Sequence, residues 1–252
     1  MNEQTPVLLA EHVGFRYPGQ STDALKEVDV TLVKGQAVGL LGPNGSGKST
    51  LIDLLMGLKK PGSGRIVRPK LSQFSMALVP QEYAFYPDLT CVENLRFFAG
   101  MLDISSDESA RRVDAAITNS MLEEFAEKRA NQCSGGVRRK LNLGIALLQK
   151  PDILLLDEPT VGIDPQSRAF ILEQVKTLVA SGCSVLYATH YMEEVSAVCS
   201  NILLLDHGTV LASGNLASLL LHPEGGMPFS NLESLFMHYT KRSLRDSGHI
   251  HE

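Results

Sequence analysis

Short apolar runs alternate with segments of helical periodicity along most of the chain. Runs rich in valine and leucine predict strands, and the stretches between them that carry apolar residues at helical spacing predict helices. Alternation of strand and helix implies a mainly parallel sheet covered on both faces, so we expect an α/β fold. The expected strands lie at PVLLAEHVGFRY (6–17), KEVDVTLVKGQAVGLLG (26–42), FSMALVPQE (74–82), DILLLD (152–157), CSVLYATH (183–190) and SNILLLDHG (200–208).

The segment from about 88 to 149 lacks strand patterns and is expected to be a helical insertion. Thr90 followed by Glu93 forms a capping-box pattern that predicts a helix start. We therefore expect a single domain with a core at about 1–87 and 150–215. The tail, about 216–252, is expected to be helical and then polar, with a frayed end, RDSGHIHE.

Composition narrows the class of protein. The 252 residues suffice for one large or two small domains, and the net charge of −5 gives no reason to expect nucleic-acid binding. The start has no signal-peptide pattern, and the apolar runs are far shorter than the roughly 20 residues that span a bilayer. The 4 cysteines form no CxxC pair, which indicates a reducing compartment and buried, inert thiols.

Residues 42–49, GPNGSGKS, match the phosphate-binding pattern G-x-x-x-x-G-K-[ST] between an expected strand and an expected helix. The glycines allow backbone N–H groups to wrap phosphates, and the helix N-terminus adds a favourable dipole. Lys48 is expected to pair with the outer phosphates, and the Ser49 hydroxyl to hold Mg²⁺.

Polar residues at other strand ends are candidates for catalysis. Asp157 and Glu158 end an apolar strand, where Asp157 suits a metal ligand and Glu158 a general base that polarises water. His190 follows another apolar strand, in the position where open α/β sheets bind ligands. Gln81 and Tyr17 are weaker candidates, for a metal or water contact and for purine stacking, since either could be an ordinary surface or core residue.

Together these residues resemble, in order and spacing, the ATP-binding subunits of ABC transporters, whose signature loop corresponds to CSGGV, 133–137. The resemblance implies a P-loop NTPase (RecA-like) core, a small antiparallel β-subdomain, a helical insertion subdomain, and ATP and Mg²⁺ as ligands. It implies nucleotide binding by Tyr17, Gly42, Pro43, Asn44, Gly45, Ser46, Gly47, Lys48, Ser49, Thr50, Ser134, Gly135, Gly136 and Asp164. It implies catalytic roles for Glu158, His190 and Gln81, and Mg²⁺ binding by Ser49, Gln81 and Asp157.

The signature departs from the family's usual Leu-Ser-Gly-Gly-Gln at Cys133 and Val137. Cysteine is a small hydrophobe that can fill the first position, whereas valine loses a side-chain hydrogen bond. We expect a working signature with weaker closure of the dimer. The resemblance also implies that two copies pack head to tail, so that each signature closes on the ATP of the other copy. The basic run 138–140 is expected to be a solvated helix face.

Details such as ATHYMEEV (188–195) are similar to ATPase subunits of type-2 ABC exporters of the daunorubicin-resistance branch. This branch implies a separate integral membrane subunit and a peripheral position on the cytoplasmic face of the inner membrane. Tyr83, Phe85 and Tyr86 are candidates for gripping that subunit, with local packing as the alternative. A soluble ABC ATPase of the iron–sulfur assembly type and a nucleotide-binding regulator with little turnover remain alternative functions.

Overall fold

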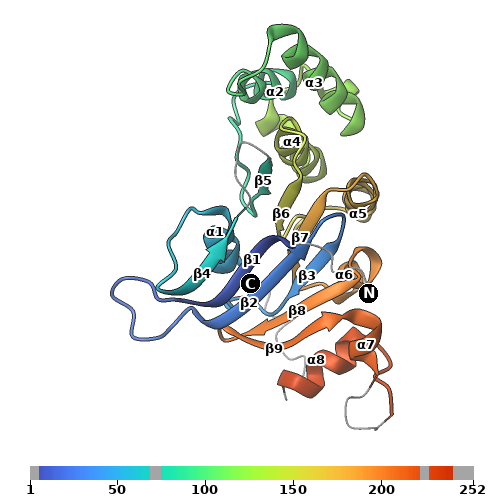
Figure 1. Ribbon diagram of the computed structural model, residues 1–252. Helices are drawn as coiled ribbons and strands as arrows, with labels where there is room; N and C mark the ends of the chain where they lie inside the picture. Colours follow the sequence, from blue (N-terminus) through green and yellow to red (C-terminus); the bar gives the residue numbers. More distant parts are fainter. Residues whose placement is uncertain (1–5, 69–74, 222–226, 241–252) are drawn as a thin grey trace, which may run out of the picture. The chain divides into compact units, whose positions relative to one another are not determined.

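The computed structural model describes residues 6–68, 75–221 and 227–240. They form two compact units, and Figure 1 labels their helices and strands. One unit comprises Leu32–Gln36, the described residues of Arg68–Ala188 and the first residues of β1. The other comprises Leu8–Thr31, Ala37–Val67 and the described residues from Thr189 onward.

Three parallel strands form the sheet of the first unit, in the order β5 (Met76–Val79), β6 (Ile153–Asp157) and β7 (Ser184–Thr189). Every residue of β6 and β7 is buried. A strand that is buried on both faces needs a continuous apolar run rather than an alternating pattern. This explains the uninterrupted ILLL before Asp157. Asp157 pairs in register with Ala188, so the acidic end of β6 lies at the carboxyl edge of the sheet.

The helices of the first unit are α2 (Cys91–Ala99), α3 (Ser106–Asn119), α4 (Gly135–Leu147) and α5 (Pro165–Ala180), with short 3₁₀ turns at Glu123–Phe125 and Ala130–Gln132. Buried residues of α2, α3 and α4 share one apolar cluster. The expected capping box begins α2: the Glu93 amide donates to Thr90 Oγ1 (3.1 Å), and the Thr90 amide donates to Glu93 Oε2 (2.8 Å). The helical insertion predicted from the sequence is therefore present, with α2, α3 and α4 in contact.

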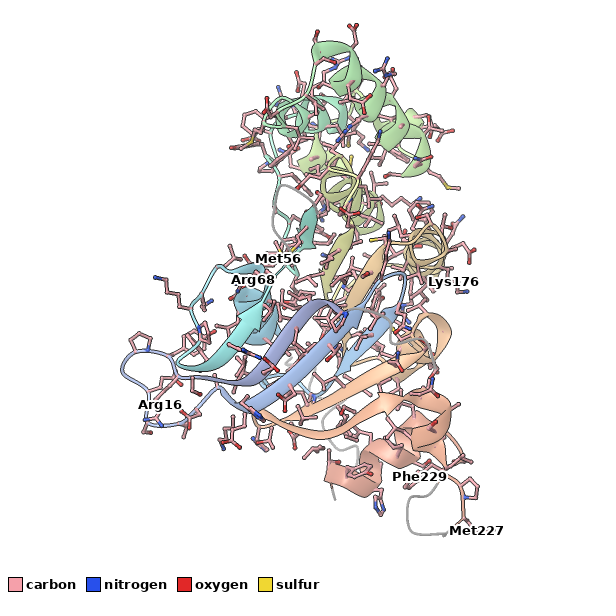
Figure 2. The ribbon with its side chains drawn as sticks, in the orientation of Figure 1. Arg16, Met56, Arg68, Lys176, Met227 and Phe229 are labelled. Atoms are coloured by element: carbon pink, nitrogen blue, oxygen red, sulfur yellow. The ribbon has the colours of Figure 1, made fainter. Side chains whose placement is uncertain are left out.

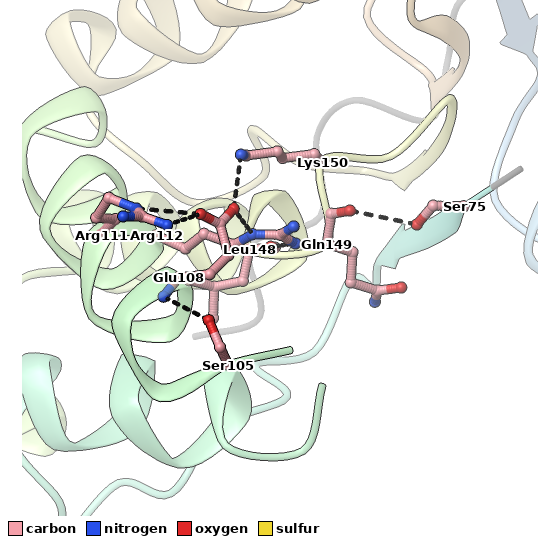
Figure 3. A network of polar contacts seen from close by, with 8 residues as sticks. All are labelled: Ser75, Ser105, Glu108, Arg111, Arg112, Leu148, Gln149 and Lys150. Carbon is pink, nitrogen blue, oxygen red and sulfur yellow. Dashed lines mark hydrogen bonds and ion pairs between the residues drawn. The ribbon is translucent and has the colours of Figure 1, made fainter. Parts of the chain in front are cut away.

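A polar network joins α3 to the segment after α4 (Figure 3). Glu108 accepts from Arg111 and Arg112 on its own helix and from Lys150 beyond α4, at 2.8–3.2 Å. Arg112 also donates to the Leu148 carbonyl oxygen (2.8 Å). These bonds lower the pKa of Glu108 to about 2, with the Arg112 hydrogen bond as the largest cause.

The second unit contains an antiparallel sheet in the order β2 (Leu25–Val33), β1 (Pro6–Phe15), β4 (Ser63–Val67). In β2, buried residues alternate with exposed ones over most of its length, as one solvated face requires. This is the antiparallel β-subdomain that the family resemblance implied. The hydrophobic pattern did not predict β4, because nearly all of its side chains are exposed.

The same unit holds β3 (Ala37–Leu41), parallel to β8 (Asn201–Asp206), which pairs antiparallel with β9 (Thr209–Asn215). The pattern also missed β9. A two-residue turn makes it possible, because His207 and Gly208 both adopt positive φ, at 47° and 74°. The helices of this unit are α1 (Lys48–Met56), α6 (Met192–Val198), α7 (Leu216–Leu220) and α8 (Leu232–Thr240).

The expected helical tail corresponds to α7 and α8, and Met227 and Phe229 lie in the segment between them (Figure 2). The predicted frayed end, 245–252, and part of the segment between α1 and Gln81 lie outside the described residues. Across the described ranges, none of the helices combines the length and apolar character that crossing a bilayer requires. All four cysteines are buried and free, and burial raises the pKa of Cys91 to about 12, as expected for inert thiols.

Candidate functional site

The residues singled out from the sequence fall into two groups, one in each unit. Each group is built around the end of a strand and the start of a helix. The second unit holds Tyr17, the loop 42–50 and His190, and the first unit holds Gln81, the loop 133–137, Asp157, Glu158 and Asp164.

The loop between β3 and α1 has the geometry of a phosphate cradle. Gly45 and Gly47 adopt φ of 78° and 111°, a region that side chains disfavour. Gly47 caps α1 without a side-chain hydrogen bond, so no capping side chain covers the N–H groups of the first turn. The buried Lys48 ammonium reaches back across the loop to the carbonyl oxygens of Gly42 (2.8 Å) and Pro43 (3.2 Å).

Close packing holds this loop in place. A Cβ on Gly42 would lie 2.2 Å from the Leu205 carbonyl oxygen, and one on Gly47 would lie 2.8 Å from the Ala24 carbonyl oxygen. The Gly208 amide donates to the Ser46 carbonyl oxygen (2.9 Å). The Ser46 hydroxyl is buried with no hydrogen-bond partner among the described residues, so it is a donor that a ligand oxygen could use.

Tyr17 lies against the first helix of the same unit. Its hydroxyl is 3.0 Å from Thr50 Oγ1, and the Lys59 ammonium lies 5.6 Å from its ring centroid. Phe15 packs edge-to-face against the ring, with centroids 5.0 Å apart. These contacts fix the orientation of an aromatic ring that is only partly buried, which suits stacking on a planar ligand.

His190 follows β7 in a turn that is held by its neighbours. The Thr189 hydroxyl is 3.2 Å from Glu194 Oε2, and the Tyr191 amide donates to that hydroxyl (3.0 Å). The Tyr191 ring lies 4.1 Å from the His190 ring, centroid to centroid. The polar Thr189–Glu194 pair is fully buried, and sequence reasoning did not single out either residue.

Asp157 and Glu158 are buried at the carboxyl end of β6, with exposed fractions of 7% and 4%. The Glu158 amide donates to the Ala188 carbonyl oxygen (2.9 Å), which extends the parallel pairing by one residue. Glu158 has φ of 48°, which is uncommon for a residue with a side chain and is typical of functional turns.

The signature loop begins α4. Ser134 is the N-cap, and its hydroxyl accepts from the Val137 amide (3.4 Å). Cys133 and Val137 belong to the buried apolar cluster that also contains residues of α2 and α3. Cys133 therefore fills an apolar position, as its small size predicts, and Val137 contributes packing.

Gly136 brings the signature against the start of α5. A Cβ at this position would lie 2.0 Å from Ser167 Oγ and 2.8 Å from Asp164 Oδ2. Asp164 caps α5 and accepts from the Ser167 amide (2.8 Å) and hydroxyl (2.7 Å), and these bonds lower its pKa. Signature and Asp164 are thus neighbours in the first unit.

The expectation that 138–140 form a solvated face is wrong for Arg139, which is 3% exposed. Its guanidinium donates to the carbonyl oxygens of Pro80 (3.3 Å) and Gln81 (3.0 Å). The guanidinium carbons of Arg138 and Arg139 lie 5.1 and 5.0 Å from the centroid of the Tyr83 ring. A basic run gives no local signal for such burial, because the partners lie nearly 60 positions earlier in the chain.

Residues 25–161 match the ABC transporter family. The chain belongs to this family. It is 41% identical over 221 residues to the linearmycin resistance ATP-binding protein of Bacillus subtilis, covering 84% of this chain and 70% of that protein. It is 38% identical over 207 residues to Nod factor export ATP-binding protein I of Cupriavidus pinatubonensis, covering 79% of this chain and 64% of that protein.

Solved structures agree with the family assignment. An ATP-binding subunit of an ABC transporter matches with a TM-score of 0.81 at 28% identity, covering 93% of this chain and 99% of that one. A dimeric ATP-binding cassette in a post-hydrolysis state, bound to ADP and Pi, matches with a TM-score of 0.73 at 27% identity, covering 83% and 98%. The protein is therefore an ABC ATPase with a P-loop NTPase fold, and it binds and hydrolyses ATP.

The residues of the cradle fit the phosphates of a nucleoside triphosphate. The uncapped first turn of α1, the positive-φ glycines and the unpaired Ser46 hydroxyl all present donors to an anion. Ser49 in the second unit, and Gln81 and Asp157 in the first, carry side-chain oxygens, which is the donor chemistry that Mg²⁺ prefers. No group of three or more His, Cys, Asp or Glu side chains in the described ranges suggests any other metal site.

Proposed function

We propose that this ABC ATPase is the motor subunit of an exporter, and that it moves a separate integral membrane subunit by binding and hydrolysing ATP. The observation that carries this proposal is the 41% identity to a resistance ATP-binding protein, supported by the 38% identity to an export ATP-binding protein. The working position is the cytoplasmic face of the inner membrane, where the protein is held by its partner. These relatives favour transport over an iron–sulfur assembly ATPase.

Nucleotide binding is assigned to the second unit. The Tyr17 ring stacks on adenine, and the loop 42–50 wraps the phosphates with its backbone N–H groups. Lys48 is already held at the loop by the carbonyl oxygens of Gly42 and Pro43, so its charge meets the outer phosphates with little reorganisation.

Hydrolysis is assigned to the polar strand ends. Glu158 acts as the general base that takes a proton from the attacking water, and His190 and Gln81 orient the γ-phosphate and that water. Ser49, Gln81 and Asp157 would hold Mg²⁺, which would neutralise charge that develops on the phosphates. The intact Glu158 and His190 argue against a regulator with little turnover.

The signature Ser134-Gly135-Gly136 serves a second copy of the chain, or a similar ATPase subunit. Ser134 is exposed at the N-terminus of a 13-residue helix, where a hydroxyl and helix N–H groups favour an anion. In the proposed head-to-tail dimer it closes on the γ-phosphate of the partner's ATP. Asp164 contacts the same interface from the start of α5.

Contact with the membrane subunit is assigned to an aromatic surface on α2 and the segment before it. Of the three aromatic candidates, Tyr83 is used inside the unit, since its hydroxyl donates to the Gly135 carbonyl oxygen (3.3 Å), and Phe85 packs on the apolar cluster. Tyr86 is 48% exposed and lies beside Phe97, which is 44% exposed. We expect this pair to meet the partner.

The proposal is tested by a pull-down from native membranes with a tagged Glu158→Gln variant in Mg-ATP. Removing the general base preserves ATP binding and traps the closed dimer, so the transport complex is retained. A multi-spanning membrane protein is expected among the captured partners. Lys48→Ala, which cannot hold the phosphates, is the matched control and is expected to lose the trapped dimer.

Recovery of purely soluble partners would contradict the transport role and favour an assembly ATPase. Tyr86→Glu tests the contact surface in the same experiment. It is expected to lose the membrane protein while the isolated ATPase activity stays unchanged, because the Tyr86 ring packs against Phe97 and Phe98 of α2.

A further inference from the structure

Helix α4 holds the segment Pro80–Ala84 at several points along the helix. Arg139 Nη1 donates to the carbonyl oxygens of Pro80 and Gln81, at 3.3 and 3.0 Å. Asn142 adds two bonds, because its Nδ2 donates to the Pro80 carbonyl oxygen (3.3 Å) and its Oδ1 accepts from the Ala84 amide (3.1 Å). The segment is therefore attached at both ends to the same helix.

Tyr83 attaches the middle of the segment to the signature. Its hydroxyl donates to the carbonyl oxygen of Gly135, the first residue of α4 (3.3 Å). Two guanidinium groups lie close to its ring, with the Arg138 and Arg139 Cζ atoms 5.1 and 5.0 Å from the centroid. One tyrosine thus contacts both the signature turn and the basic residues that follow it.

Burial makes these contacts difficult to break. Arg139 is 3% exposed and has no carboxylate partner within the described residues, so two carbonyl oxygens and one ring face stabilise its charge. Moving the segment away from α4 would leave a buried cation without compensation, which is strongly unfavourable. Local displacement of the segment without α4 is therefore disfavoured.

We propose that Arg139 is a positioning residue that makes the Gln81 segment and the signature helix one rigid body. This inference rests on the proposed function, in which Gln81 serves one nucleotide and Ser134 serves another. A displacement of Gln81 then moves Ser134 and Gly135 by the same amount, so the state of one site is reported to the other through α4.

Hydrogen exchange tests the rigid body without requiring turnover. In Arg139→Met, which keeps an unbranched apolar side chain but loses the fork of donors, exchange of amides in 80–86 and in 134–138 is expected to rise together, by about tenfold or more. The matched control is Lys140→Met on the same helix. Lys140 contacts α5 and not the segment 80–84, since its ammonium lies 4.6 Å from the Phe170 centroid. Lys140→Met should leave amide exchange in both segments at the wild-type rate.

Turnover provides the second measurement. Arg139→Met is expected to lower kcat about tenfold with KM for ATP within about twofold of wild type, since misplacement of catalytic groups affects the reaction more than binding. Arg139→Lys, which retains the charge, should restore part of kcat. Loss of protection in only one of the two segments, or a kcat within twofold of wild type, would overturn the proposal.

Two further comparisons keep the outcomes separable. If Arg139→Met fails to fold, Tyr83→Phe and Arg139→Lys carry the test, because Tyr83→Phe removes only the hydroxyl bonded to Gly135. It should raise exchange in 134–138, and no change would count against the rigid body. If the wild-type chain has no ATPase activity with its partner, the proposed function fails, while the exchange result still judges the role of Arg139.

Discussion

Gly136 illustrates how one backbone position connects two functional loops. It lies where α4 meets the start of α5, so close that any side chain would enter the space of Ser167 and Asp164. Neighbouring Gly135 has more room, since the nearest atom to a Cβ there is the Gly162 carbonyl oxygen at 3.4 Å. The two glycines of the signature therefore have different physical reasons to lack a side chain.

This difference predicts opposite outcomes for two matched substitutions. Gly136→Ala is expected to destabilise the protein by about 1–3 kcal/mol, the usual cost of overpacking, and to lower ATPase activity. Gly135→Ala should be near neutral or slightly stabilising, because alanine is the better helix former and meets no close contact. Urea unfolding measures both, and equal stabilities of the two variants would contradict the steric argument.

Glu108, in the first turn of α3, illustrates how a single helix is held against its neighbours. Thr90 and Glu93 begin α2 through local hydrogen bonds, whereas α3 relies on Glu108, which joins Arg111 and Arg112 to Lys150 beyond α4. Such networks retain more stability than isolated surface pairs, because several partners share one ordered side chain. The attachment of α3 should accordingly depend on the charge of Glu108.

The lowered pKa of Glu108 predicts how the stability of the protein changes with pH. A carboxylate whose pKa falls on folding stabilises the protein fully above its usual pKa of 4.5 and loses that contribution as the pH falls towards about 2. Glu108→Gln should therefore be less stable than wild type at neutral pH, and the difference in free energy of unfolding should shrink in acid. Denaturant unfolding between pH 7 and pH 3 measures it.

A control on another helix separates this network from ordinary surface pairing. Glu173 forms an exposed pair with Lys176 at 3.5 Å within α5. Glu173→Gln should change the free energy of unfolding little at any pH. A pH-independent effect of Glu108→Gln would show that its cost comes from packing and not from charge.

At the scale of the whole molecule, the proposed division of labour between loops implies that one chain is an incomplete enzyme. The phosphate cradle and the signature would serve different nucleotides in a head-to-tail pair. A two-fold axis between the copies would place each signature against the nucleotide that the other copy's cradle holds. Activity should therefore be a property of the dimer.

Complementation tests this expectation. Lys48→Ala disables the cradle and Ser134→Arg disables the exposed signature, so each variant alone is expected to be inactive. An equimolar mixture should regain about a quarter of wild-type activity, because random pairing gives half heterodimers with one intact site each. ATPase assays on the mixture, with dimer formation followed by light scattering, provide the measurement. Dimers that form without any recovered activity would contradict the shared site.

The sequence alone determined the features that depend on contiguous residues. The cradle at 42–49, the capping box of α2, the buried run before Asp157 and the order of the motifs are each encoded locally, and the structure confirms the strands and helices around them. The resemblance they support identified the family, which the comparisons confirm. The roles assigned to individual site residues remain predictions.

Burial and contacts between distant segments could not be predicted from any local stretch of the sequence. Arg139 is buried because Pro80, Gln81 and Tyr83 provide carbonyl oxygens and a ring, and no local pattern in a basic run records such distant partners. Tyr83, a candidate for a partner contact, also donates its hydroxyl to the Gly135 carbonyl oxygen, a contact that no local pattern predicts. Strand β4 has almost no buried face to produce alternation, so its pairing with β1 fixes it. Local chemistry specifies motifs and caps, whereas burial depends on which distant segments fold against each other.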